Sequence, residues 1–260
     1  MPIYSYIERD SFIHRLHPTV KVFGLFVMFW SVYWVDHPVA LLPIGLLLVI
    51  LAQASGAGPN FRRMRWLFIL AFTSAISWLF FYRQGKALVN VPLMHISQVS
   101  LVFGFSRGMK VAELLAAVLL FLSTTKIEEF AFGLQRIGMP YRVGFTFSLA
   151  FRLVPLFMDS AATIVDAQRL RGYDFSQGSM IQRMRRYMGV SIPVFMAALR
   201  KANNMAMALD ARGFGRSSQP TTFIDYPIRP ADVVAFAALV AIGAIHFMIY
   251  RSGFGTIRPH

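Results

Sequence analysis

The chain has 260 residues, a formal net charge of +14 and no cysteine. Hydrophobic residues make up 56 % and charged residues only 15 %, against roughly 25 % charged residues in an average soluble domain. Such a chain should bury most of its surface in lipid or protein, and without cysteine it has no disulfide framework, cysteine nucleophile or cysteine-based metal site.

Five apolar stretches come close to the length of about 20 residues that crosses the hydrocarbon core of a bilayer. They are residues 20–35, 39–54, 67–82, 111–123 and 231–250. Tryptophan and tyrosine lie near several of their ends, as in the aromatic belts of membrane proteins. The sequence therefore predicts an all-α integral membrane protein with about five transmembrane helices.

The net charge has two interpretations, a nucleic-acid-binding surface or the positive-inside bias of a membrane protein. If the N-terminus is cytoplasmic, 20 of the 26 Lys and Arg residues lie in cytoplasmic segments. The short loop that carries Arg62, Arg63 and Arg65 gives the same orientation. We therefore attribute the charge to topology, with a cytoplasmic N-terminus and an external C-terminus, and we expect no nucleic-acid partner.

Between residues 126 and 230 the apolar residues are interleaved with arginine. Residues 126–138 predict a short amphipathic helix that Gly138-Met139-Pro140 ends. Two helices of about thirty residues should follow, over 142–171 and 180–212, bent at Pro155 and Pro193. Three domains result: transmembrane helices one to four in 1–125, a cytoplasmic domain of long amphipathic helices in 126–230, and a C-terminal transmembrane helix in 231–260.

The second long helix carries an apolar stripe on a 3.6-residue period. Its members are Met180, Met184, Met188, Ile192, Phe195 and Leu199. The stripe either packs on a neighbouring helix or faces an exchangeable partner. Methionine suits the second role, because its flexible thioether repacks against different shapes.

Both long helices should end in the same way, with Arg171-Gly172 in one and Arg212-Gly213 in the other, each followed by an aromatic residue. One interpretation is local, since a cation is favourable beside the unpaired carbonyls of a helix C-terminus. The alternative is a docking element. Glycine would end the helix, and the arginine fork would form paired hydrogen bonds to a carboxylate or to carbonyls of a partner.

These motifs resemble those of the transmembrane T component of energy-coupling-factor (ECF) transporters. That family has an Ala-Arg-Gly motif at the end of each of two cytoplasmic coupling helices. Ala211-Arg212-Gly213 matches it in full, and Leu170-Arg171-Gly172 matches it with Leu in place of Ala. The family's N-terminal motif resembles residues 11–21, with His17 in place of Asp and Thr19 in place of Arg. The resemblance extends over nearly the whole chain.

The resemblance implies a scaffold subunit in a prokaryotic plasma membrane. Two ATP-binding-cassette ATPases would dock on Leu170, Arg171, Gly172, Ala211, Arg212 and Gly213. A small membrane protein, the substrate-binding S component, would contact Met180, Met184, Met188, Ile192 and Phe195. We expect no catalytic residue, cofactor or metal in this chain, and ATP and Mg in the partner subunits. The phosphate-binding motif G-x-x-x-x-G-K-[ST] is absent from the sequence.

Two other functions compete with this one: a self-sufficient secondary transporter, and a membrane-anchored interaction protein. The first would need a charged or broken-helix site near the bilayer middle, which the sequence does not show. His14 and His17 have no further ligands nearby, so we expect them to order a helix start rather than bind a metal. We expect Glu113 to reach water or Lys110. The substrate, whether cobalt, nickel, biotin or another vitamin, would be determined by the S component.

Overall fold

The computed structural model describes residues 6–7, 9, 11–81, 87–91, 94–175, 179–215 and 226–253. The chain divides into two compact units, Met1–Pro140 with Tyr226–His260, and Tyr141–Asp225. The described helices of the first unit are α1 (Pro18–Trp34), α2 (Pro38–Ser55), α3 (Gly58–Arg63), the 3-10 turn η1 (Arg65–Leu67), α4 (Phe68–Phe81), α5 (Gln98–Thr124), α6 (Ile127–Ile137) and α9 (Pro230–Arg251). The second unit contains α7 (Tyr141–Leu170) and α8 (Met180–Ala211).

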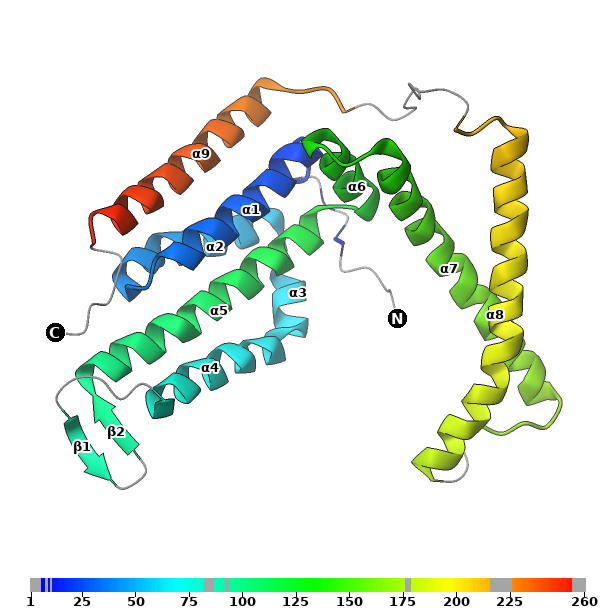
Figure 1. Ribbon diagram of the computed structural model, residues 1–260, viewed down its shortest axis with the longest axis horizontal. Coiled ribbons are helices and arrows are strands. Elements are labelled where there is room, and N and C mark those ends of the chain that lie inside the picture. Colours follow the sequence, from blue (N-terminus) through cyan, green and yellow to red (C-terminus); the bar gives the residue numbers. More distant parts are fainter. Residues whose placement is uncertain are drawn as a thin grey trace. The chain divides into compact units, whose positions relative to one another are not determined.

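In the first unit the long helices lie side by side, as Figure 1 shows. α5 packs against α4, α2 and α1, and α1 packs on its other sides against α9 and α6. The main apolar core lies where α1, α2 and α5 meet, and its members include Met28, Val32, Val35, Leu41, Ile44, Leu48, Ala117 and Leu120.

The first unit has small polar side chains inside and large apolar side chains outside. Ser31, Ser55, Ser100, Ser106 and Ser123 are each at most 1 % exposed. The outer surface carries large apolar side chains that are more than half exposed, including Phe26, Trp30, Leu46, Ile69, Phe72, Val234 and Met248. Membrane helices pack through small and polar residues, because lipid solvates the large apolar ones as well as protein does. The chain is therefore a membrane protein.

Prolines and short polar side chains start these helices. Pro18 and Pro38 follow the N-cap residues of α1 and α2, where a missing N–H is no loss. The Nδ1 atom of His17 accepts a hydrogen bond from the Thr19 N–H at 3.2 Å. This confirms the prediction that His17 orders a helix start.

Within the described residues each of the five predicted spans falls mainly in helix, but the helices differ in length. By length and composition, α2, α7 and α9 could each cross a membrane, and α5 with α6 passes as one span bent by 108°. α1 and residues Arg65–Trp78 form shorter apolar helices. α7, which we assigned to the cytoplasmic domain, is thus apolar enough to span. The count of five and the predicted domain boundaries stay predictions.

Two features differ from the sequence-based expectations. The strands β1 (Ala87–Val91) and β2 (Met94–Ser97) form an antiparallel hairpin between α4 and α5, which we did not predict. Such short apolar runs give no reliable period. α6, which we grouped with the long helices, belongs by its contacts to the first unit.

The packing of α6 on α1 predicts the effect of a single methyl group. A Cβ atom at Gly133 would lie 2.8 Å from Val22 Cγ2 and 3.1 Å from the Pro18 carbonyl oxygen. We expect Gly133→Ala to lower the free energy of unfolding by about 1–3 kcal/mol, as overpacking does. Gly189→Ala in α8 is the matched control, because nothing lies within 4 Å of its Cβ position. It should be neutral or stabilising by up to about 1 kcal/mol. Thermal unfolding in detergent measures both, and equal effects would contradict the prediction.

Candidate functional site

The two Arg-Gly ends have the same backbone structure. Gly172 and Gly213 have φ of +87° and +73°. The N–H of the residue after each glycine bonds back across the last turn, from Tyr173 to the Gln168 carbonyl and from Phe214 to the Leu209 carbonyl, each at 3.0 Å. These are Schellman ends, which need a left-handed residue at the glycine position. The predicted helix ends are confirmed to within one residue.

Backbone N–H groups already bond to the Gln168 and Arg169 carbonyls of α7 and to the Leu209 and Asp210 carbonyls of α8, so these carbonyls do not need the arginine side chains. Both Arg171 and Arg212 are exposed. In the described residues neither guanidinium has a hydrogen-bond or ion-pair partner. A purely local capping role therefore does not give the guanidinium donors of Arg171 and Arg212 a hydrogen-bond acceptor within the described structure.

The aromatic residues after each glycine anchor the motif on the other long helix. Phe214 packs on Phe145 near the start of α7, with ring centroids 4.2 Å apart. After Arg171, Phe175 is only 4 % exposed and packs on Tyr187 of α8 with centroids 5.0 Å apart. Each end is thus held by packing while its arginine stays free to bind.

The six predicted docking residues lie at two separate ends rather than in one site. The first end packs near Tyr187, and Arg212 lies 25 positions further along the chain, or roughly 35–40 Å along a helix. Leu170 is 91 % exposed, and Arg171, Gly172, Ala211 and Arg212 are also exposed. Two such ends provide two protruding cations, each able to form a bidentate contact with a carboxylate.

The apolar stripe on α8 is exposed in the second unit. Its exposed fractions are 86 % for Met180, 68 % for Met184, 58 % for Met188, 69 % for Ile192 and 62 % for Phe195. Exposed apolar surface can serve a protein partner or lipid, so the two alternatives for the stripe stay predictions.

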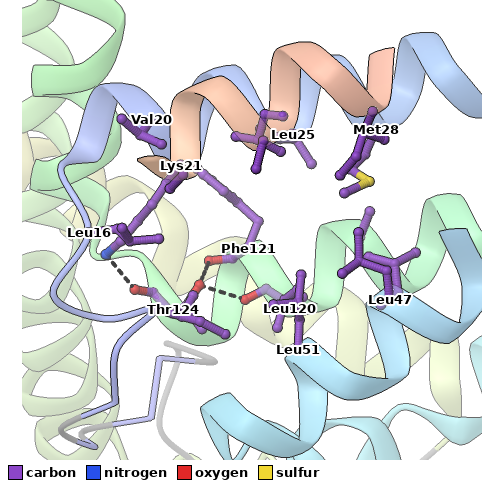
Figure 2. A pocket seen from close by; sticks show the side chains of 18 of the residues that line it. Leu16, Val20, Lys21, Leu25, Met28, Leu47, Leu51, Leu120, Phe121 and Thr124 are labelled. Carbon is purple, nitrogen blue, oxygen red and sulfur yellow. Dashed lines mark hydrogen bonds between the residues drawn. The ribbon is translucent and has the colours of Figure 1, made fainter. Parts of the chain in front are cut away.

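A buried lysine at the start of α1 binds together several parts of the first unit. The Nζ atom of Lys21 donates to the His14 carbonyl at 2.9 Å, to the Thr124 carbonyl at 3.0 Å and to Glu129 Oε2 at 2.9 Å. All three donors of the ammonium are thereby used. Figure 2 shows the lysine stem crossing the edge of an apolar pocket of about 240 Å³ between α1, α2, α5 and α9. Lys21 belongs to the N-terminal motif at residues 11–21, but no local pattern in the sequence predicts this role.

The rest of the N-terminal motif is fixed around the same point. The Asp232 carboxylate, 2 % exposed, accepts from the backbone N–H of His17 and of Arg229, each at 2.7 Å. His14 Nδ1 lies 2.7 Å from Ser11 Oγ. Burial, and secondly the Lys21 ammonium, lower the pKa of His14 from its ordinary value, which favours the neutral ring. Among the described residues no group of three or more His, Cys, Asp or Glu side chains is placed to hold a metal ion.

The surroundings of Glu113 differ from those that we predicted. It is only 4 % exposed. Lys110, its expected partner, instead binds Asp36 Oδ1 at 2.6 Å and the Tyr33 carbonyl at 3.0 Å. The prediction that Glu113 reaches water or Lys110 is wrong, because Asp36 at the end of α1 lies closer to the ammonium.

The first unit and the paired long helices together define a multi-helix membrane protein with two exposed cationic helix ends. Residues 9–222 match the CbiQ family model, described as cobalt transport protein, and the chain belongs to this family. It is similar to energy-coupling factor transporter transmembrane protein EcfT of Streptococcus thermophilus, with 29 % identity over 95 % of this chain and 97 % of that one. It is also similar to EcfT of Bacillus selenitireducens, with 28 % identity over 92 % and 94 %.

A third relative is of another kind. A putative ABC transporter ATP-binding protein of Bifidobacterium longum is 30 % identical over 90 % of this chain, which corresponds to 32 % of its own length. In that relative a segment similar to this chain forms part of a longer protein whose name specifies ATP binding.

Proposed function

We propose that the chain is the transmembrane component of an ATP-driven ECF-type importer of a vitamin or a metal ion. It couples ATP hydrolysis by partner ATPases to the movement of a substrate-binding S component. The observation that carries this proposal is the pair of Arg-Gly ends, which share one backbone structure and both present an arginine without an internal partner. Family membership and the names of the relatives support the same function.

In this assembly the chain is a transporter subunit, and ATP with Mg is bound by its partners. Two ATPases dock on the two Arg-Gly ends, one on each. The Bifidobacterium longum relative supports an ATPase partner, because it combines a similar segment with an ATP-binding name. The distribution of Lys and Arg supports a plasma membrane location with the N-terminus inside and the C-terminus outside.

The experiment that tests this function is purification of the tagged chain from its native membranes in mild detergent, followed by mass spectrometry. We expect ATPases and a small hydrophobic membrane protein to accompany it. Recovery of the chain alone, with solute binding of its own and uptake that needs no ATP, would instead establish a self-sufficient transporter.

The exposed stripe on α8 predicts where the S component binds. A charge at Met188, in the middle of the stripe, has to be desolvated when an apolar partner covers it. We therefore expect Met188→Glu to lower the recovered S component by roughly tenfold or more, with ATPase recovery unchanged. Met207→Glu is the matched control, since Met207 is 62 % exposed on the same helix but lies outside the stripe. Equal losses in the two variants would argue against the assigned surface.

A further inference from the structure

The first unit is joined to the second by two chain connections, and the parts of the first unit next to them, α6 and the chain from Tyr226, share one cluster of side chains. The chain leaves the first unit after α6, at residues 138–140, and returns to it at Tyr226. We define the connector cluster as six residues of the first unit: His17, Lys21, Glu129, Phe132, Tyr226 and Asp232. They come from the start of α1, from α6 and from the segment that begins α9.

One half of the connector cluster is aromatic. Tyr226, where the chain returns, packs on Phe132 of α6, where the chain leaves, with ring centroids 5.0 Å apart. The His17 ring lies edge-on to both, at 5.9 Å from Phe132 and 6.4 Å from Tyr226. Tyr226 and α6 are therefore packed against each other and against the N-cap residue of α1.

The other half is charged and buried. The ion pair between Lys21 Nζ and Glu129 Oε2, at 2.9 Å, joins α1 to α6 with side chains 4 % and 14 % exposed. Asp232 accepts from the N–H groups of His17 and Arg229, so one carboxylate holds the starts of α1 and α9 together. The close approach of Gly133 to Pro18 makes the contact between α6 and α1 tight as well.

Beyond this cluster the backbone itself is not helical. Gly138 has a φ of +123° and Pro140 follows two residues later, so α6 and α7 are not one continuous rod. Rotation about these bonds lets α7 change its direction relative to α6, so what the chain transmits is a pull or push at the end of α6. Because side-chain contacts fix α6 and Tyr226 to α1, such a pull acts on α1 as well.

We propose that the connector cluster is a transmission joint, in which Lys21 and Glu129 are positioning residues that make transport follow ATP hydrolysis. This inference rests on the proposed function. In the joint, α6 and Tyr226 move together with the start of α1, so a pull from α7 on α6 is passed on to α1 and α9.

The chain offers a matched control for a buried lysine. Lys110 is 8 % exposed in its side chain and pairs with Asp36 at 2.6 Å. Asp36 follows the C-terminal end of α1, whereas the connector cluster surrounds its N-terminal end. The 17 residues of α1 separate the two pairs by about 25 Å. Lys110→Met removes a comparable ion pair that touches neither connection.

The experiment measures uptake and ATP hydrolysis together, in proteoliposomes that contain the complete complex. The variants are Lys21→Met, Glu129→Gln, Tyr226→Ala and the control Lys110→Met. We expect the number of substrate molecules imported per ATP hydrolysed to fall roughly fivefold or more in the first three, the scale of a typical coupling between sites. The ratio should stay at the wild-type value in Lys110→Met. A purely structural role would lower uptake and hydrolysis together and leave the ratio unchanged.

Tyr226→Ala keeps the inference testable if the charged variants fail to assemble. It leaves the Lys21–Glu129 ion pair and the hydrogen bonds of Asp232 in place. Wild-type uptake per ATP in any assembled variant of the first three would overturn the transmission joint, as would an equal drop in Lys110→Met. Failure of the proposed function has a different signature: no ATPase would then accompany the unmutated chain.

Discussion

Replacing Arg171 and Arg212 together by alanine is expected to abolish ATP-driven uptake while the chain still folds and inserts into the membrane. Both side chains are exposed and have no hydrogen-bond or ion-pair partner in the described structure, so their removal breaks no such interaction of the fold. At a docked interface, truncation of one partner of a buried charged hydrogen bond costs about 2–5 kcal/mol. That weakens ATPase association roughly 30-fold or more at each end. Uptake assays and ATPase recovery in pull-downs measure the effect.

Two further variants make this prediction specific. Arg171→Lys and Arg212→Lys should also fail, because an ammonium keeps the charge but cannot form the paired hydrogen bonds of the guanidinium fork. Arg200→Ala is the matched control, an exposed arginine of α8 that lies away from the helix end. It should leave uptake unchanged. Normal uptake in the double alanine variant would reduce both Arg-Gly motifs to ordinary helix ends.

Replacing Lys21 by alanine is expected to lower the free energy of unfolding of the chain by about 3–5 kcal/mol, since it leaves the Glu129 carboxylate buried without its cation. It also leaves the Thr124 and His14 carbonyls without their lysine donor. Replacing both partners, as Lys21→Met with Glu129→Met, should recover most of the loss. A buried ion pair is often no more stabilising than apolar residues of similar volume.

Thermal unfolding of purified variants in mild detergent completes this double-mutant cycle. Arg200→Ala in α8, at an exposed position, is the control and should change stability by no more than about 0.5 kcal/mol. If Lys21→Ala were as mild as the control, the three hydrogen bonds of Lys21 would not hold the first unit together. Because this cycle measures stability alone, it is independent of uptake per ATP in the connector variants.

Stability and function are thus divided between different lysine and arginine residues. Lys21 and Lys110 are buried and paired inside the first unit. Arg171 and Arg212 extend from anchored helix ends in the second unit. The net charge of +14 does not distinguish these two groups of cations. The partner of each cation does, so it is the better guide to the role of that residue.

The helices and their ends could be predicted from local sequence because their causes are local. Apolar runs predict the membrane helices, and a 3.6-residue period predicts the stripe of α8. Gly172 and Gly213 adopt the left-handed backbone conformation that ends each long helix. The two Arg-Gly motifs could be found for the same reason, since each is contiguous in the chain. Family membership followed from these motifs in their order and spacing.

The tertiary structure alone decided the partners of the buried charges. Lys21 and Glu129 are 108 positions apart, and His17 and Asp232 are 215 apart, so no periodicity connects them. Lys110 pairs with Asp36 and not with Glu113, three positions away, because helix packing places the Asp36 carboxylate 2.6 Å from the Lys110 ammonium. Whether the methionine stripe was covered or open also depended on the neighbouring helix. Burial and long-range pairing are properties of packing, and packing depends on how the helices are arranged in space.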